Sequence, residues 1–361
     1  MVQDAFLLDW APNYSHLVGI AAEERCGLTP RGCSGTTSLQ DLRGKIAIMT
    51  SLVIGGGGLV GAGVVRLLLD KGEEQPVVFS RNPANSKAIG DVADHIRFVD
   101  GDLGNFSHVM DAVKKAKPRV IYHLGAMLPP PSEADPSSAM ETNALGTFHV
   151  LEAARLFDIP QVLFASTILV YWPGSQENVF DDYALERPFT LYGITKLFGE
   201  QLGLFYKRKY GLDFRGVRYP NVMGPGRPPG RATSLSRVIE ECARGNTFTM
   251  PMNPETKLPS VYFKDAARAI VALGKAPLEE IKTVNYVVNG LIHTPSVGEL
   301  GGTIRDQIPG ARIDFQPDPE LQAFIDSFFR PIDDSNARQE WGWQPMYDLE
   351  GMVDDFIQEL N

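Results

Sequence analysis

The chain has 361 residues, 43% of them hydrophobic, which is enough to bury the core of one large α/β domain or of two small ones. Its 44 acidic residues outnumber 34 basic ones, for a net charge of −10, and no basic run is long enough to follow a phosphate backbone, which argues against a nucleic-acid partner. Three cysteines without a C-x-x-C pair, or a histidine at metal-ligand spacing, predict reduced thiols and no metal site.

Residues 1–48 show no sustained periodicity and are expected to form an N-terminal extension ahead of a domain that begins at Met49. The start of the chain carries Asp4 and Asp9 and lacks the basic and apolar segments of a secretory signal, so a cytoplasmic protein is expected. Residues 46–65 are uncharged and long enough to span a bilayer. Their six clustered glycines instead predict a loop between a strand and a helix, and no membrane contact is expected.

After Met49, short apolar segments alternate with amphipathic ones, which is typical of a parallel sheet covered by helices on both faces. The predicted strands are Ser51–Ile54, Pro76–Ser80, Ile96–Val99, Val120–Leu124, Gln161–Ser166 and Asp213–Arg218. The predicted helices are Val60–Lys71, Asn105–Lys115, Ser138–Phe157 and Leu191–Tyr210. Right-handed crossovers then give an α/β fold with a Rossmann-type doubly wound parallel sheet over about residues 49–218. The Pro- and Gly-rich remainder, about 219–361, predicts a smaller C-terminal substrate-binding lobe of loops over the carboxyl edge of the sheet.

Three glycines follow the first predicted strand. Gly55, Gly58 and Gly61 form the pattern G-x-x-G-x-x-G and open the helix that begins at Val60. Glycine lets the backbone turn sharply and approach a pyrophosphate, and a helix N-terminus adds N–H groups and a partial positive charge. The pattern therefore predicts a dinucleotide, although a glycine-rich loop alone is also compatible with a simple turn.

The ends of the next two strands bear on which dinucleotide is bound. The second strand ends at Ser80-Arg81, 26 residues after Gly55, where an enzyme specific for NAD usually holds an acid against the ribose hydroxyls. An arginine there suits a 2′-phosphate and favours NADP over NAD. Asp102 follows the third strand and is expected either to accept a hydrogen bond from the adenine amino group or to cap the helix from Asn105.

A phenol and an ammonium group lie four residues apart on the helix predicted from Leu191. At this spacing Tyr192 and Lys196 share one face of the helix, and a neighbouring cation lowers the pKa of a phenol from about 10 toward the neutral range. Thr167 lies at the end of the strand from Gln161, at the edge where open α/β sheets hold ligands. It is a candidate donor to a substrate oxygen, or else a residue that caps the strand end. Together the three side chains predict proton exchange by Tyr192.

With these residues, the chain resembles the extended short-chain dehydrogenase/reductases, in the group of epimerases and dehydratases. The resemblance spans the chain after Met49 and rests on Gly55–Gly61, Val120–Ala126, Glu141–Thr147, Ser166–Thr167, Tyr192–Lys196 and Arg218–Val222. It implies that Thr167, Tyr192 and Lys196 form a catalytic triad and that Lys196 also binds the nicotinamide ribose. It further implies a homodimer joined by the long helices at 138–157 and 191–210.

The strand ends and the resemblance together define the expected site. Cofactor contacts are expected from Gly55, Gly58, Leu59, Val60, Gly61, Arg81, Asp102, Leu103, Leu124, Gly125, Ala126, Asn143, Tyr192, Lys196, Tyr219, Asn221 and Val222. Contacts with a small-molecule substrate are expected from Met127, Thr167, Ile168, Thr233 and Leu235.

The C-terminal half is similar to the short-chain type of L-threonine 3-dehydrogenase. The similar stretches include Gly216–Pro220, Ile332–Arg338 and Trp341–Trp343. The substrate positions differ, because Pro129 stands where that enzyme has a serine and Leu235 where it has an acid suited to an amino group. An ammonium group without a carboxylate partner is costly in a closed site, so a substrate less charged than threonine is favoured.

The favoured prediction is an oxidoreductase that transfers a hydride reversibly between NADP or NAD and a small secondary alcohol or ketone. A nucleotide-sugar epimerase is the second candidate, suggested by Asn221 and Gly224–Gly226, although the arginine that such enzymes carry before the late Asp265 is missing. Arg231 and Arg237 are candidate phosphate contacts in its place, or else solvated residues. A catalytically silent cofactor-binding protein is the third candidate, since a fold does not guarantee chemistry.

Overall fold

The computed structural model describes residues 50–70, 75–81, 87–174, 178–227, 233–291 and 293–360. The extension expected over residues 1–48, the expected domain start at Met49, the end of the first predicted helix at Lys71 and the candidate phosphate contact Arg231 lie outside the described residues. Within the described ranges, no helix is both long enough and apolar enough to cross a membrane.

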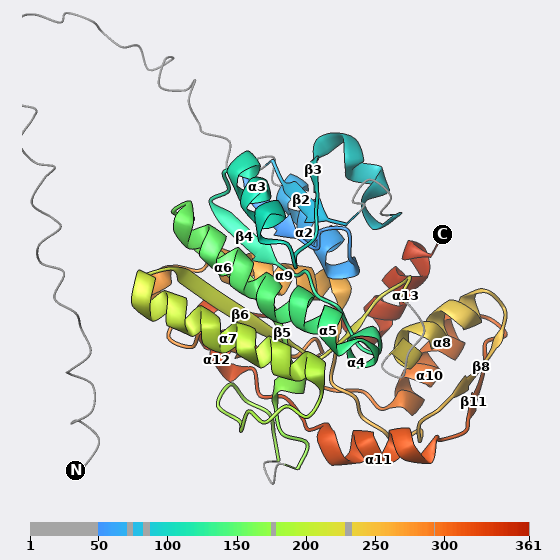
Figure 1. Cartoon of the computed structure of the whole chain (residues 1–361). Coiled ribbons are helices and arrows are strands. Elements are labelled where there is room, and N and C mark those ends of the chain that lie inside the picture. Colours follow the sequence, from blue (N-terminus) through green and yellow to red (C-terminus); the bar gives the residue numbers. More distant parts are fainter. Residues whose placement is uncertain are drawn as a thin grey trace, which may run out of the picture. The chain divides into compact units, whose positions relative to one another are not determined.

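Seven parallel strands form the central sheet in the order β10-β6-β5-β4-β1-β2-β3 (Figure 1). Their bounds are β1 Ser51–Ile54, β2 Val77–Ser80, β3 Arg97–Asp100, β4 Val120–His123, β5 Gln161–Thr167, β6 Asp213–Tyr219 and β10 Asn285–Val287. The chain runs outward from β1 to β3 and then crosses to β4 on the other side of β1. The carboxyl ends of β1 and β4 therefore flank the point where doubly wound sheets bind their ligands. The predicted fold is confirmed, with β10 as an additional strand that the sequence did not predict.

Side chains alternate between the two faces of the sheet, as the period of a strand requires. On one face Val53 and Leu163 pack against α2 and α9, and on the other face Leu52 and Phe164 pack against α3, α6 and α7. In Figure 1, α6 and α7 lie in front of the sheet and α9 lies behind it. The bounds of these helices are α2 Leu59–Asp70, α3 Phe106–Ala116, α6 Gly146–Leu156, α7 Leu191–Tyr210 and α9 Phe263–Lys275.

Local signals fix both ends of α7, which has the predicted bounds. Thr190 caps the first turn by accepting a hydrogen bond from the Gly193 N–H group at 3.0 Å, and Gly211 ends the helix in the left-handed conformation with a φ of 72°. The helix predicted over Ser138–Phe157 is instead built from three pieces. These are α5 Pro136–Ala139, a π-helical segment η4 Met140–Leu145, and α6.

The C-terminal part of the chain adds a smaller lobe with an apolar core around Val238, Leu300 and Met352. Its elements are α8 Ser234–Ala243, β8 Thr247–Met250, α10 Val297–Gln307, β11 Arg312–Phe315, α11 Pro319–Phe328 and α13 Leu349–Glu359. Two parallel strand pairs complete it, β8 with β11 and β7 Asn221–Met223 with β9 Ser260–Tyr262. Helices rather than the expected loops therefore dominate this lobe. Shorter helical segments of the chain are η3 Lys87–His95, α4 Pro131–Ala134, η5 Ile168–Val170, η7 Leu278–Glu280 and α12 Ser335–Trp341.

Candidate active site

Two glycines of the first motif occupy positions where a side chain does not fit. Gly55 follows β1 with a φ of 81°, and a Cβ atom there would lie 2.7 Å from the main-chain nitrogen of Gly125. A Cβ atom on Gly61 would lie 2.2 Å from the carbonyl oxygen of Gly55. The loops that follow β1 and β4 therefore approach each other through main chain alone.

The first turn of α2 lies beside this contact. Leu59 and Val60 begin the helix, both partly buried, and no acidic residue in the first turn neutralises the positive end of the helix dipole. A cradle lined by main chain at a helix N-terminus fits the diphosphate of a nicotinamide dinucleotide. Gly55, Gly58 and Gly61, with the two residues that begin α2, would hold that group.

The residues predicted at the adenosine end differ in their contacts. Arg81 is exposed directly after β2. Asp102 accepts a hydrogen bond from the Gly104 N–H group at 2.8 Å, so its carboxylate closes the turn after β3, and Asn105 is the residue that caps α3. Leu103 is buried in the core between the sheet and α3. Of these side chains, Arg81 therefore has the exposure that a ligand contact needs.

Asn143 ties the loop after β4 to α7. Its side-chain oxygen accepts from the Met127 N–H group at 2.7 Å, and its amide group donates to the Met127 carbonyl oxygen at 3.0 Å and to the Thr195 hydroxyl at 3.2 Å. Because all these partners belong to the protein, this predicted cofactor residue acts as a clamp. The clamp holds Leu124–Met127, which are partly buried, beside the helix that carries Tyr192.

Thr167 is the last residue of β5. Its hydroxyl oxygen accepts from the Leu169 N–H group at 3.2 Å, which caps η5. A hydroxyl that accepts through its oxygen keeps its proton for donation, so capping and donation to a substrate oxygen are compatible. Ile168, predicted to touch the substrate, is 2% exposed and packs in an apolar cluster with Tyr171.

Tyr192 and Lys196 are both buried, with 8% and 3% of their surface exposed. The Lys196 ammonium group donates to the carbonyl oxygen of Ala165 in β5 at 2.8 Å. It lies 5.7 Å from the centre of the Tyr192 ring and 4.8 Å from the centre of the Phe164 ring. β5 therefore positions Thr167 directly and the ammonium group through Ala165.

The residues predicted near the nicotinamide contact other protein groups. Tyr219 is buried and donates to the Ala266 carbonyl oxygen in α9 at 2.7 Å, so its side chain belongs to the core. The side-chain oxygen of Asn221 accepts from Arg227 Nη1 at 3.3 Å, and the Val222 carbonyl oxygen accepts from the same nitrogen. Arg227, which was not predicted, is thus the partner of two predicted cofactor residues.

Two predicted substrate residues lie at the start of α8. Thr233 is buried at the N-terminal cap of that helix. Leu235 is 5% exposed and packs in the apolar core of the C-terminal lobe. Leu235, which stands where the resemblance places an acid that binds the substrate's amino group, is therefore part of the core of the C-terminal lobe.

A model of the NAD dependent epimerase/dehydratase family matches residues 51–288, which include the glycine cradle, Thr167, Tyr192 and Lys196. The chain belongs to this family. A mitochondrial L-threonine 3-dehydrogenase of Sus scrofa is 31% identical over 306 residues, which cover 84% of this chain and 80% of that protein.

Solved structures of similar proteins support the same assignment. An L-threonine dehydrogenase of Phytophthora infestans matches with a TM-score of 0.75 and 30% identity, over 86% of this chain and 98% of its own. A GalE-like L-threonine dehydrogenase of Cupriavidus necator, in its holo form, matches with a TM-score of 0.76 and 26% identity, over 86% of this chain and 100% of its own. The predictions of an extended short-chain dehydrogenase/reductase fold and of a nicotinamide-dependent enzyme are confirmed.

Burial dominates the ionisation of Tyr192 and Lys196 in this epimerase/dehydratase family member. Burial raises the pKa of Tyr192, and it lowers the pKa of Lys196 to about 7, while the charge of Glu200 acts in the opposite direction on the lysine. The sequence predicted that Lys196 would lower the pKa of the phenol. Instead the cation that lowers the pKa of Tyr192 is Arg227, and burial has the larger effect. The predicted effect of Lys196 on the phenol is not seen because the lysine is itself buried, and burial disfavours its positive charge.

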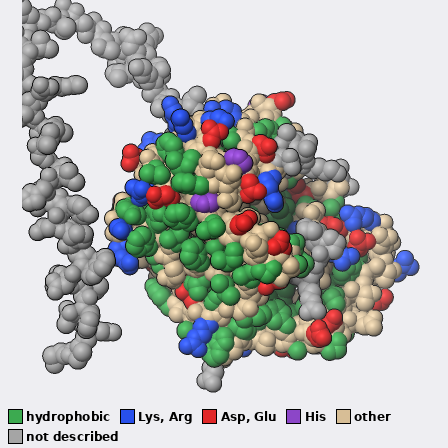
Figure 2. Space-filling model, in the orientation of Figure 1, with side chains coloured by type: hydrophobic (Ala, Val, Ile, Leu, Met, Phe, Trp, Pro, Cys, Tyr) green, Lys and Arg blue, Asp and Glu red, His purple; other side chains and the backbone are tan. Residues whose placement is uncertain are grey.

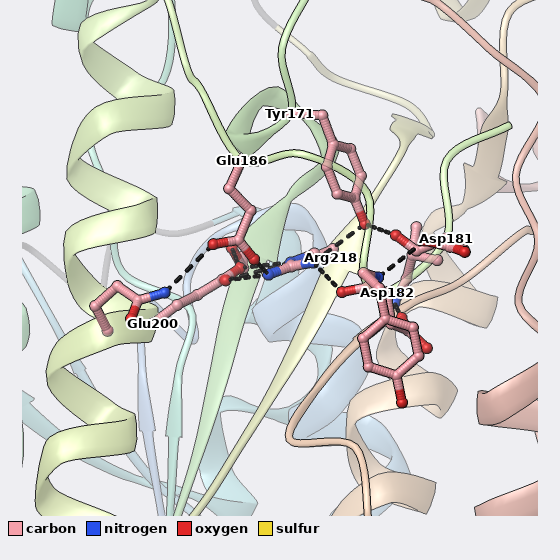
Figure 3. A network of polar contacts seen from close by, with 10 residues as sticks. Tyr171, Asp181, Asp182, Glu186, Glu200 and Arg218 are labelled. Atoms are coloured by element: carbon pink, nitrogen blue, oxygen red, sulfur yellow. Dashed lines mark hydrogen bonds and ion pairs between the residues drawn. The ribbon is translucent and has the colours of Figure 1, made fainter. Parts of the chain in front are cut away.

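Glu200, one turn after Lys196, is held by a buried arginine (Figure 3). Arg218 in β6 donates to the two carboxylate oxygens of Glu200 at 3.0 and 2.6 Å and also to Glu186. Ser166 in β5 donates to Glu200 at 2.5 Å. Since Arg218 and Glu200 are almost fully buried, this network fixes the middle of α7 against β5 and β6.

Two residues that interact with Tyr192 were not predicted. Glu133, in α4, accepts from the N–H groups of Leu191 and Tyr192 at 3.1 and 3.0 Å, so it caps the helix that carries the phenol and the lysine. No local pattern links it to a helix that begins 58 residues later. Arg227 did leave a signal, because it is the only charged residue within the Pro- and Gly-rich segment 224–230.

Proposed function

We propose that this family member is an oxidoreductase that transfers a hydride reversibly between a nicotinamide dinucleotide and a small secondary alcohol or ketone. Its catalytic residues in this proposal are Thr167, Tyr192 and Lys196. One observation carries it: the ammonium group of Lys196 is bonded to the carbonyl oxygen of Ala165. This contact joins the helix of the phenol to the strand that ends in the threonine hydroxyl.

The proposed mechanism assigns one task to each side chain. In the oxidation direction the deprotonated oxygen of Tyr192 accepts the proton of the substrate hydroxyl as the carbonyl forms, and in reduction the phenol returns that proton. Thr167 donates a hydrogen bond to the same substrate oxygen, the positive charge of Arg227 favours the phenolate, and Lys196 would hold the nicotinamide ribose. A bound nicotinamide dinucleotide supplies the matching chemistry, since it accepts a hydride from the carbinol carbon or returns it.

The proposed substrate lacks the ammonium group of threonine. The similar proteins that are named as L-threonine dehydrogenases support a dehydrogenase. Leu235 nevertheless stands where the resemblance predicts an acid, and it is buried among apolar side chains. Because leucine does not compensate a charged amino group, L-threonine is expected to be a poor substrate compared with a secondary alcohol that lacks this group.

For the cofactor, we propose NADP in preference to NAD. Arg81 is exposed directly after β2, where an acid would select the ribose hydroxyls of NAD. A guanidinium group matches a phosphate in geometry and charge.

The first test is the substitution Tyr192→Phe. We expect turnover to fall by about 100- to 10,000-fold, because the phenol oxygen is the proposed proton carrier. The dissociation constant of the dinucleotide, measured by tryptophan fluorescence, should stay unchanged. Tyr210→Phe, at the exposed end of α7, is the matched control. A Tyr192→Phe protein that bound the dinucleotide and retained most of its turnover would refute the assignment.

A second measurement separates the alternatives. A net change in nicotinamide absorbance on addition of dinucleotide and an alcohol or ketone supports a dehydrogenase. Inversion of a nucleotide sugar with no net absorbance change would support an epimerase. Tight dinucleotide binding without turnover over a broad panel of alcohols and ketones would support a catalytically silent binding protein.

We further propose that the protein is a homodimer joined through α6 and α7. Large apolar side chains are exposed along both helices and on η4, and Figure 2 shows hydrophobic side chains gathered on this face of the molecule. This surface, the α6–α7 face, comprises Met140, Leu145, Phe148, Leu156, Ile194, Phe198, Phe205 and Tyr210. An apolar surface of this kind on a folded domain marks an interaction site.

A further inference from the structure

Arg227 lies in the loop that follows β7. Its Nη1 atom donates to the Val222 carbonyl oxygen and, at 3.3 Å, to the side-chain oxygen of Asn221. Gly224 in the same loop faces the glycine cradle, since a Cβ atom there would lie 2.8 Å from Cδ2 of Leu59. The loop therefore lies where β7 and the first turn of α2 meet.

The guanidinium group of Arg227 is a partly buried cation that interacts with the proposed base. Burial lowers the pKa of Arg227 and Tyr192 acts in the opposite direction, while Arg227 lowers the pKa of Tyr192. In the described part of the chain no carboxylate forms an ion pair with Arg227. Glu240, which contacts the same loop by accepting from the Gly226 N–H group at 2.9 Å, is paired with Arg244.

We propose that Arg227 binds a carboxylate group of the substrate, so that the enzyme acts on hydroxy acids and the corresponding keto acids. This inference rests on the proposed function and names its substrate class. The planar guanidinium group matches a carboxylate in a two-bond pair, and arginine keeps its charge even when it is partly buried. Nη1 is anchored to the main chain of β7, so the group is held in place before the acid arrives.

The charges of the site fit an acid that has no amino group. Leu235 leaves the predicted ammonium position without a carboxylate, whereas Arg227 adds a cation that the sequence analysis did not assign. Glu133 is already bonded to the main-chain N–H groups of Leu191 and Tyr192, and Glu200 is already bonded to Arg218. The site therefore complements a negative substrate.

The diphosphate of the dinucleotide is the other anion that Arg227 is able to meet. The first turn of α2 already offers main-chain N–H groups to that diphosphate. The Gly224 N–H group donates to the Ser236 hydroxyl at 3.2 Å, so the loop of Arg227 is also joined to the start of α8, which carries the predicted substrate residues Thr233 and Leu235. This contact favours the substrate carboxylate, and affinities measured separately for the two ligands distinguish the sources.

The test compares Arg227→Met with the unchanged protein by calorimetric titration. The probe is 2-hydroxy-2-methylpropanoate, an acid whose tertiary alcohol does not undergo oxidation, added to the protein saturated with dinucleotide. Its amide, 2-hydroxy-2-methylpropanamide, is the uncharged analogue. We expect Arg227→Met to weaken binding of the acid by about 10- to 100-fold and to change binding of the amide and of the dinucleotide by no more than about twofold. In turnover by the unchanged protein, 2- or 3-hydroxybutanoate should exceed 2-butanol.

Two further variants control for folding and for general charge. Arg227→Lys keeps the positive charge but loses the planar guanidinium group that forms two hydrogen bonds with a carboxylate. An intermediate loss of acid binding is therefore expected, at an unchanged melting temperature. Arg244→Met removes an exposed cation of the same lobe and should leave every constant unchanged.

The inference is overturned if the unchanged protein does not prefer the acid to the amide, or if Arg227→Met weakens both equally. It is also overturned if the variant weakens the dinucleotide in place of the acid, which would assign the arginine to the diphosphate. Failure of the proposed function is a separate result, because it is measured by the turnover of Tyr192→Phe, whereas the acid is titrated without turnover.

Discussion

His123 ends β4, and its imidazole is buried beside the ring of Phe164. The hydroxyl of Thr147 donates to the Asn143 carbonyl oxygen at 2.6 Å, so it accepts from Nε2 of His123 at 3.0 Å. The proton of the neutral ring is therefore on Nε2, and Nδ1 is buried without a hydrogen-bond partner in the described part of the chain. Burial, and then the charge of Lys196, lower the pKa of His123 to about 3.

This buried histidine predicts acid sensitivity. Between pH 6.5, the ordinary pKa of histidine, and pH 3, the unfolded chain binds a proton that the folded protein excludes, so the free energy of unfolding falls as the pH falls. At pH 4.5 the loss from this residue is about 2–3 kcal/mol relative to pH 7. The free energy of unfolding is measured with urea at pH 7 and at pH 4.5. Its loss between the two should be smaller in His123→Gln, whose amide still donates to Thr147, than in the unchanged protein, and the difference should equal the contribution of the histidine. Equal losses in the two proteins would contradict the prediction.

The exposed side chain of Arg81 predicts which dinucleotide binds more tightly. Arg81→Glu places an acid against the 2′-phosphate of NADP, so we expect the dissociation constant for NADP to rise by about 10-fold or more. The dissociation constant for NAD should stay unchanged or fall, because a carboxylate accepts hydrogen bonds from the free ribose hydroxyls. Fluorescence titration with both dinucleotides measures the two constants. If the dissociation constants for NADP and NAD changed by the same factor, Arg81 would not be the residue that binds the 2′-phosphate.

At the scale of single elements, α7 depends on a cap supplied by another segment. Glu133 accepts from the first N–H groups of α7 and also lies at the positive end of the helix dipole. Glu133→Ala should lower the free energy of unfolding by about 1 kcal/mol, and Glu133→Gln, which keeps an acceptor oxygen, should lower it by less.

The same pair of variants tests whether the cap positions Tyr192. We expect kcat to fall in Glu133→Ala while the dissociation constant of the dinucleotide is unchanged, with partial recovery in Glu133→Gln. A cap that serves stability alone would lower the melting temperature and leave kcat as it is. Steady-state kinetics and thermal unfolding on one preparation separate these outcomes.

The elements that sequence predicts well are those with local causes. α7 has a capping threonine, a terminal glycine and a long amphipathic pattern, and its bounds are as predicted. The first six strands are apolar runs that lie within a residue or so of their predicted positions. β10 has three residues, and it becomes a strand because β6 leaves an edge to pair with. The π-helical segment η4 packs against α7, and no residue pattern in the sequence predicted it.

The candidate site shows the same limit. Gly55, Tyr192 and Lys196 were predicted because their spacing along the chain carries chemical meaning. Arg227 reaches the site from a loop and Glu133 from the short helix α4, and only the fold brings them to Tyr192. Asn143 and Tyr219, predicted as cofactor contacts, also bond to other parts of the protein, and their positions in the sequence did not indicate these bonds. Sequence spacing therefore predicts the chemistry of one helix better than contacts between distant segments.

At the scale of the whole molecule, the α6–α7 face predicts the oligomeric state. We expect a dimer by size-exclusion chromatography with light scattering, because burying the face in a second copy removes its apolar side chains from water. Phe148→Glu combined with Phe198→Glu should shift the protein to a monomer, since paired copies would bury four carboxylates. Met346→Glu, at an exposed apolar position of the C-terminal part, is the control. A dimer that survived the double substitution would place the interface elsewhere.

The amide of Asn143 grips both main-chain groups of Met127 and reaches the hydroxyl of Thr195 with the same nitrogen. The loop that holds Met127 and the helix that carries Tyr192 are therefore joined by one side chain, that of Asn143. We expect a replacement that widens this loop for a bulkier substrate to shift Tyr192 as well, unless a second replacement restores the hydrogen bonds of residue 143. Changes of specificity in this enzyme should accordingly arise in pairs, with one member remote from the bound molecule.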